Sequence, residues 1–199
     1  MHIRPYQPGD RDAVHEICIR TADAGQDASG SYVDPGVLPN IFAHPYTHLE
    51  PELAFVVDDD GRAVGYVLGT ADTAVFVRRF RAEWLPLVGD RYPAPAGEPG
   101  NPDEVMAHLL HTPERMILPD LADYPAHLHI DLLPEHQRAG WGRKLIDTFT
   151  DALRRAGAPG VHLGMLSENR AARAFYDRLG FHVVDVVDPG LLTYLGLRL

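Results

Sequence analysis

The feature that most constrains this chain is the segment HQRAGWGRKL, residues 136–145, which separates an alternating stretch from an amphipathic one. The preceding residues 126–134, AHLHIDLLP, alternate apolar and polar side chains as a strand does, and Pro134 ends the alternation because it cannot donate a ladder hydrogen bond. After the turn, apolar residues recur every four positions and predict a helix: Trp141, Leu145, Phe149 and Leu153. The sequence therefore predicts a strand, a glycine-containing turn and a helix, in this order.

This turn has the chemistry of an anion site. Backbone N–H groups in the first turn of a helix lack partners within the helix, and the helix dipole makes this end positive. We expect Gly140 and Gly142 to let ligand oxygens approach where a Cβ would collide. Arg138, Arg143 and Lys144 add positive charge. A phosphate or pyrophosphate site is favoured over a tight turn without a ligand, although the spacing matches neither a P-loop nor a dinucleotide fingerprint.

The composition bounds the class of protein. The chain has 199 residues, enough for one domain with a full core, and its apolar and charged fractions, 45% and 23%, are those of a globular protein. Its formal net charge is −10, which argues against nucleic acid or an anionic membrane as a partner, because both favour a basic surface. An acidic protein instead suits small molecules and cationic substrates such as amines.

Two features concern the compartment. Cys18 is the one cysteine, so no internal disulfide can form, which is compatible with a reducing compartment. Residues 1–20 carry charges throughout and lack the apolar core of a signal peptide. No stretch approaches the roughly 18 apolar residues of a membrane span. We therefore expect a soluble, cytoplasmic protein.

The rest of the chain alternates strand and helix patterns. Near the N-terminus we expect a short strand and then a helix with Asp10 as its N-cap and Gly25 as its stop, followed by a loop or short irregular helix over 28–52. Asp60-Gly61 between two apolar runs predicts a hairpin. Further segments are predicted as helices (73–89, 102–111, 168–180), a strand (160–167) and a final hairpin (181–199). This order predicts α/β organisation from residue 126 onward.

Two motifs in this order resemble the GCN5-related N-acetyltransferase (GNAT) superfamily. The first is Q-R-A-G-W-G at 137–142, directly after a strand that ends in proline. The second is an N-x-x-A-x-x-F-Y-x-x-x-G-F pattern, matched by Asn169, Ala172, Phe175, Tyr176, Gly180 and Phe181. Longer stretches, among them LADYPAHLHIDL, resemble the acetyltransferase-like C-terminal domain of eukaryotic O-GlcNAcase and its free-standing bacterial relatives. In the eukaryotic domain the pyrophosphate turn is degraded, whereas here it is intact.

The resemblance implies an α/β fold with a mixed, mostly antiparallel sheet of six to seven strands flanked by helices on both faces. It implies a single domain over 1–199, with an extended insertion at about 74–126. The implied activity is transfer of an acetyl group from acetyl-CoA to a primary amine on a small molecule or peptide. The alternative is a module that binds acetyl-CoA or a protein partner without catalysis. Superfamily members often dimerise, so a homodimer is compatible with the resemblance.

The resemblance also assigns cofactor-binding residues. The turn and the helix start would bind the pyrophosphate of acetyl-CoA through Gln137, Arg138, Ala139, Gly140, Trp141, Gly142, Arg143 and Lys144. The superfamily polarises the thioester carbonyl with a backbone N–H where the strand splays from its neighbour, and the matching positions are Leu132 or Leu133. Asn169 would cap its helix and would also reach the cofactor.

Two residues are candidates for proton transfer. Asp131 lies on the polar face of its strand with His129 and is the candidate base; a structural acid bound to His129 or to an arginine is the alternative. Tyr176 matches the tyrosine that protonates the departing thiolate, although it could instead be a core aromatic. His127, His129 and His136 lack an acidic or cysteine partner in a recognisable pattern, so we expect no metal site.

Overall fold

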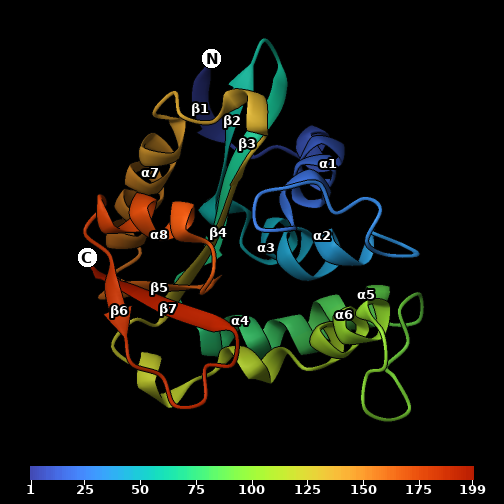
Figure 1. Cartoon of the computed structure of the whole chain (residues 1–199). Coiled ribbons are helices and arrows are strands. Elements are labelled where there is room, and N and C mark those ends of the chain that lie inside the picture. Colours follow the sequence, from blue (N-terminus) through green and yellow to red (C-terminus); the bar gives the residue numbers. More distant parts are fainter.

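A seven-stranded sheet, in the order β1-β2-β3-β4-β5-β7-β6, forms the centre of the computed structural model, which describes all of residues 1–199 (Figure 1). Every pair of neighbouring strands is antiparallel except β4 and β5, which are parallel. The strands are β1 (His2–Pro5), β2 (Ala54–Asp59), β3 (Arg62–Thr70), β4 (Ala126–Leu132), β5 (Gly160–Leu166), β6 (His182–Val184) and β7 (Leu192–Arg198). This confirms the predicted α/β fold with a mixed, mostly antiparallel sheet.

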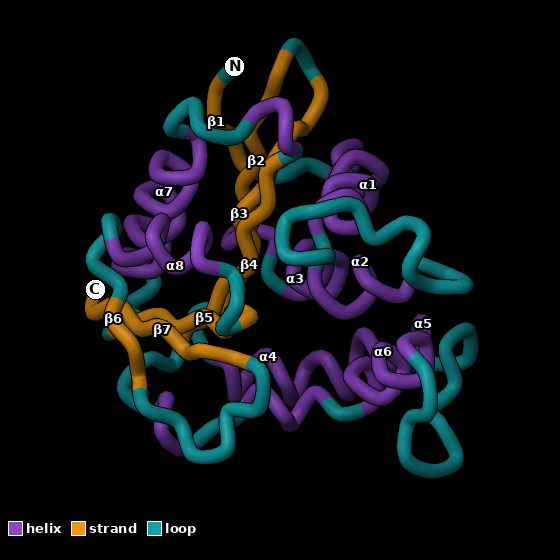
Figure 2. The backbone as a smooth tube through the Cα atoms, viewed as in Figure 1, coloured by secondary structure: helices purple, strands orange, loops and turns teal.

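Helices cover both faces of the sheet. On one face lie α1 (Arg11–Thr21), α2 (Val37–Phe42) and α3 (His44–Leu49), and on the other lie α7 (Trp141–Arg155) and α8 (Arg170–Asp177) (Figure 2). The segment between β3 and β4 contains α4 (Thr73–Arg79), α5 (Leu85–Val88) and α6 (Pro102–His111), and α6 packs against α2. Because both faces are covered, β3 is buried along nearly its whole length and shows no simple alternation. None of the helices combines the length and apolar composition that a transmembrane span requires.

The two parallel strands separate soon after they meet. β4 and β5 pair only through Ala126 with Val161 and through His127 with His162, so the remainder of β4 has no partner on that side. Beyond this point β5 continues along β7, and Figure 2 shows these two strands turning away from β4. The sheet therefore opens between β4 and β5 on the side where β4 ends.

The predicted central hairpin is confirmed. Asp60 and Gly61, with φ of 49° and 90°, form the two-residue connection between β2 and β3. A turn with two positive φ values matches the twist of paired strands, which is why Asp-Gly is favoured there. The hairpin supplies core residues that are fully buried, including Val56 and Val67.

Three local expectations near the N-terminus are corrected. Asp10 has helical backbone angles and makes no cap bond to α1, because its carboxylate instead accepts from the Arg4 guanidinium at 2.7 and 2.8 Å and from the Gln7 amide at 2.8 Å. α1 ends at Thr21, four positions before Gly25. Within the segment 28–52, residues 28–36 form the expected loop, but the rest contains two short helices, α2 and α3, whose side chains are nearly all buried. Their apolar residues are too few to show helical periodicity, so only packing reveals them.

Candidate active site

The turn before α7 holds its backbone in an unusual conformation. After a 3₁₀ turn at Pro134–His136, Arg138 and Gly140 both adopt positive φ, 60° and 84°. The N–H groups of residues 138–143 have no hydrogen-bond acceptor in the protein, and no side chain caps α7. By contrast, the N-termini of α4, α6 and α8 are capped by Asp72, Asn101 and Asn169. The longest helix thus presents a row of free donors at its positive end.

The structure adds a reason of its own for each of the two glycines. At Gly140 a Cβ would meet nothing, and glycine is favoured there by the positive φ. At Gly142 a Cβ would lie 3.1 Å from the ring of Phe175, so glycine allows α7 and α8 to pack closely. These are a backbone reason and a packing reason for glycine, and the expectation that both glycines leave room for ligand oxygens stays a prediction beside them.

The side chains around the turn have different partners. The Gln137 amide donates to the Leu132 carbonyl at 2.9 Å and joins the turn to the end of β4. Arg143 donates to the Arg178 carbonyl at 3.0 Å, and the Lys144 ammonium lies 4.0 Å from the centre of the Trp141 ring. Among the three cations of the turn, only the exposed Arg138 has no protein partner.

Strand alternation decides which amide faces the opening between β4 and β5. Leu133 donates its N–H to the Val64 carbonyl at 3.0 Å, toward β3. Successive N–H groups of a strand point in opposite directions, so the N–H of Leu132 faces the open side. Leu133 is therefore not available as a donor to a thioester, and Leu132 is the residue that remains.

Asp131 is held in a polar but poorly solvated environment. Its carboxylate accepts a hydrogen bond of 2.7 Å from the Tyr66 hydroxyl, the residue directly opposite on β3. It is bound to neither His129 nor an arginine, so both of those expected structural partners are absent. Burial raises the pKa of Asp131 from its ordinary 3.8 to about 6, and the Tyr66 and Thr21 hydroxyls oppose this rise. Such a carboxylate is ionised at neutral pH yet remains a useful proton acceptor.

The two strand histidines belong to a buried network centred on Tyr46. The Tyr46 hydroxyl lies 2.8 Å from His127 Nε2 and 3.1 Å from His129 Nε2, and His127 Nδ1 lies 2.7 Å from the Thr73 hydroxyl. Burial lowers the pKa of both histidines, that of His129 to about 4, so both rings are neutral at pH 7. No sequence pattern singles out Tyr46, because residues 28–52 are expected to form a loop or a short irregular helix. His136 lies apart in the 3₁₀ turn.

Arg115 is a second residue that sequence reasoning missed. It follows α6 in a 3₁₀ turn, is half-buried and forms no ion pair. Its charge contributes to the lowered pKa of His127 and His129, and burial lowers its own pKa. No sequence signal separates this arginine from the sixteen others, because its position depends on how the helical segment packs against β4.

Tyr176 lies on α8 between two aromatic rings. It is 8% exposed, and its ring centre lies 5.1 Å from that of Phe175 and 5.3 Å from that of Phe181. Its hydroxyl has no protein partner but keeps contact with solvent. Burial, together with the charge of Asp131, raises its pKa. Tyr176 is thus a core aromatic by its ring, while its hydroxyl stays free.

Asn169 is confirmed as the N-cap of α8. Its side-chain oxygen accepts a hydrogen bond of 3.0 Å from the Ala172 amide. This capping explains the residue without a ligand, and contact with a cofactor remains a prediction.

An opened parallel strand pair beside an uncapped helix N-terminus is the defining feature of this α/β fold. The family described as Acetyltransferase (GNAT) domain matches residues 115–183. The structure of SsHAT is similar over 99% of this chain and 97% of that one, with 61% identity and a TM-score of 0.96. The structure of yncA from Salmonella typhimurium, which contains its cofactor acetyl-CoA, covers 99% of this chain and 92% of that one at 20% identity, with a TM-score of 0.56.

The sequence is also similar to Protein O-GlcNAcase from Rattus norvegicus. The two are 24% identical over 180 residues, which are 89% of this chain and 20% of the relative. This chain thus spans about a fifth of that protein. Together with the fold, these likenesses show that the chain belongs to the GCN5-related N-acetyltransferase superfamily.

The raised pKa of Asp131 predicts a stability effect. An acid whose pKa is raised by folding stabilises the fold below its unfolded pKa and loses this contribution as pH rises through its folded pKa, here from about 4 to about 6. The Asp131→Asn variant should therefore unfold with a free energy on the order of 1 kcal/mol higher than the native protein near pH 7.5, with little gain near pH 4. Urea denaturation at both pH values measures this, with exposed Asp147→Asn as control. An equal gain in the free energy of unfolding at both pH values would contradict the raised pKa of Asp131.

Proposed function

We propose that this protein is an acetyl-CoA-dependent N-acetyltransferase that moves the acetyl group directly to a primary amine. The main support for this proposal is the row of unpaired N–H groups at residues 138–143, beside the opening between β4 and β5. A diphosphate supplies the acceptors that these donors lack, and the helix dipole favours its charge. The family supports acetyl transfer in general, and the amine acceptor is our inference.

The turn would position the cofactor through main chain more than through side chains. Arg138 is exposed and unpaired, so it would add a charge-assisted contact to the diphosphate. Gln137 holds the turn against the end of β4, which sets the distance between the diphosphate and the strand gap. Asn169, Arg143, Lys144 and Trp141 have protein partners of their own and would shape the site. The free N–H of Leu132 would donate to the thioester oxygen as charge develops on it.

Asp131 would act as the proton acceptor. An alkyl amine with a pKa of about 10.4 is neutral in only about one molecule in 10³ at pH 7, so the site must help remove a proton. The ionised Asp131 carboxylate attracts the ammonium group and takes the proton as the nitrogen bonds to the acetyl carbon. The neighbouring His129 is neutral and does not repel the cation.

Tyr176 would complete the transfer. As the carbon–sulfur bond breaks, its free hydroxyl donates a proton to the leaving thiolate. Its raised pKa keeps the phenol protonated across the physiological range, as a donor requires.

A charge reversal at the turn tests cofactor binding. Gly142→Glu would also disturb the contact with Phe175, whereas Arg138→Glu changes only an exposed side chain. We expect Arg138→Glu to weaken acetyl-CoA binding at least tenfold in titration calorimetry, because a carboxylate would face the diphosphate. Arg155→Glu, exposed at the other end of α7, should bind within about twofold of the native protein. Equal affinities of the two variants for acetyl-CoA would exclude the turn as the diphosphate site.

Removing the Tyr176 hydroxyl tests the acid role. We expect Tyr176→Phe to lower kcat at least tenfold while acetyl-CoA affinity changes less than about twofold, because a proton donor acts on the leaving group. Tyr124→Phe is the matched control, since that hydroxyl binds His182. If Tyr176→Phe reacts at the full rate with a verified acceptor, Tyr176 is not the proton donor. The acceptor itself comes from a thiol-release screen of small amines, amino sugars, polyamines and peptides.

The pH dependence of the rate tests the base. With an accepted amine, kcat/KM should rise with pH through an ionisation near 6, the pKa of Asp131. In Asp131→Asn this ionisation should be missing and the rate lower by about 10²-fold or more. A profile that keeps the same ionisation in Asp131→Asn would assign it to another group. Binding of acetyl-CoA without thiol release for any amine would instead support a binding module.

A further inference from the structure

Arg115 differs from every other arginine of the chain. It is half-buried, yet its guanidinium forms no ion pair and no hydrogen bond, and the neighbouring Glu114 pairs with Arg81 instead. Each of the other sixteen arginines either has a hydrogen-bond acceptor or is exposed. The buried side-chain atoms that lack a partner belong to His44 and Tyr92, so the Arg115 nitrogens still contact solvent. A guanidinium that gives up water without gaining an acceptor costs free energy, so we expect an anionic group to bind Arg115.

The strand registers place the residues around the opening between β4 and β5 on one face of the sheet. His127 of β4 pairs with His162 of β5, and the two ring centres lie 5.6 Å apart. Because side chains alternate along a strand, His129 lies on this face of β4 and Gly164 on this face of β5. Tyr194 of β7 pairs with Gly164 and therefore shares the face. Gly164 is exposed and has no side chain, so β5 adds none to the opening at this position.

Arg115 lies close to both sides of this opening. The sulfur of Met116, the next residue, lies 4.0 Å from the Tyr46 hydroxyl, which in turn lies 3.1 Å from His129 Nε2. On the other side, the charge of Arg115 acts on the hydroxyl of Tyr194 as it does on that of Tyr46. Tyr194 is half-buried, and its hydroxyl has no partner in the protein. The guanidinium and this hydroxyl are thus two sets of free donors beside the opening.

The opening holds charges of opposite sign that do not neutralise each other. The Asp131 carboxylate, on the same face of β4 as His129, accepts from the Tyr66 hydroxyl and forms no ion pair. Arg115 lies near His129 instead, and residues two apart on a strand are separated by about 7 Å. A ligand that satisfies both groups therefore carries an ammonium and a carboxylate about 7 Å or more apart.

We propose that the acetyl acceptor is a small zwitterion whose amine lies at Asp131 and whose carboxylate binds Arg115. This inference rests on the proposed function and names its substrate class. A guanidinium pairs with a carboxylate through two parallel hydrogen bonds, and the Tyr194 hydroxyl adds a further donor. An extended dipeptide spans about 7 Å, and an ω-amino acid of similar length does the same. An α-amino acid is too short, because its amine and its carboxylate are attached to the same carbon.

The carboxylate holds the acceptor and takes no part in the bond changes. The neutral amine nitrogen bonds to the acetyl carbon as its proton passes to Asp131, the carbon–sulfur bond breaks, and Tyr176 donates a proton to the thiolate. The products are the N-acetylated acceptor and coenzyme A as its thiol. Acetylation removes the positive charge of the acceptor, so the product is no longer attracted to Asp131 and can leave.

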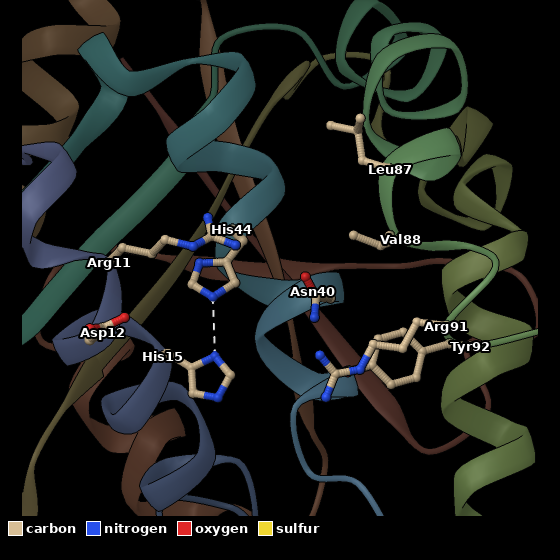
Figure 3. A pocket seen from close by; sticks show the side chains of 9 residues that line it. All are labelled: Arg11, Asp12, His15, Asn40, His44, Leu87, Val88, Arg91 and Tyr92. Carbon is tan, nitrogen blue, oxygen red and sulfur yellow. Dashed lines mark hydrogen bonds between the residues drawn. The ribbon is translucent and has the colours of Figure 1, made fainter.

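Titration calorimetry on the full chain, without acetyl-CoA, tests the site. 6-Aminohexanoate should bind about tenfold more tightly than hexylamine, which lacks the carboxylate. Arg115→Gln should remove this preference. Arg11→Gln is the matched control and should keep it, because Arg11 is also unpaired but is exposed at a separate cavity beside α1 and α5 (Figure 3). Equal binding of the two probes to the native protein, or a preference that persists in Arg115→Gln, would overturn the proposal.

Arg115→Glu gives a readout that a structural role would not produce. Its carboxylate should reverse the preference, so that 1,6-diaminohexane binds about tenfold more tightly than 6-aminohexanoate. The variants should fold, because Arg115 has no partner to lose, and the Tm of Arg115→Gln should equal or exceed that of the native protein. A lower Tm together with an unchanged probe preference would show that Arg115 serves the fold and would overturn the proposal.

Thiol release in the presence of acetyl-CoA separates this inference from the proposed function. The kcat/KM of the native protein should be about tenfold higher for 6-aminohexanoate or glycylglycine than for hexylamine or glycine. The faster of the first two distinguishes a free ω-amino acid from a peptide. Equal values for all four amines would overturn the inference and leave acetyl transfer standing. Binding of 6-aminohexanoate through Arg115 without thiol release from any amine would instead overturn the proposed function and leave the zwitterion site.

Discussion

The structure depends on how briefly β4 and β5 are paired. Two residue pairs join these parallel strands before they part, while β4 remains fully paired with β3 and β5 with β7. Each half of the sheet therefore has its own hydrogen-bonded ladder, and the backbone of β4 can leave N–H groups unpaired along one side. The opening costs few hydrogen bonds because it lies at a junction between two complete ladders.

The second constraint is the uncapped start of α7. Free N–H groups at a helix end are commonly satisfied by a side chain, as at α8, or by water or a ligand. At α7, which follows the left-handed Arg138 and Gly140, no side chain does this. The helix is anchored by its buried face and by close packing of Gly142 against Phe175. The N–H groups at the start of α7 are therefore left to water or to a ligand.

Burial sets the charge of the polar groups that lie between the sheet and the helices α1 and α3. Asp131 and His129 are buried enough to shift their pKa values in opposite directions, one toward a better base and the other toward neutrality. Both retain hydrogen bonds, to Tyr66 and Tyr46. An amine entering this region would meet one negative group and no imidazolium. The charge pattern therefore comes from burial, which acts differently on acids and on bases.

Local chemistry alone determined much of this protein. The Asp60-Gly61 hairpin, the strand that ends before Pro134 and the parity that places Asp131 and His129 on one face of β4 could all be read from the sequence, because each depends on neighbouring residues. Tertiary structure alone decided that the N–H of Leu132 and not that of Leu133 faces the opening, and that Gly142 packs against Phe175. It also decided that Tyr46 and Arg115 lie close to His129. These depend on which distant segments meet, and a one-dimensional pattern carries no information about that.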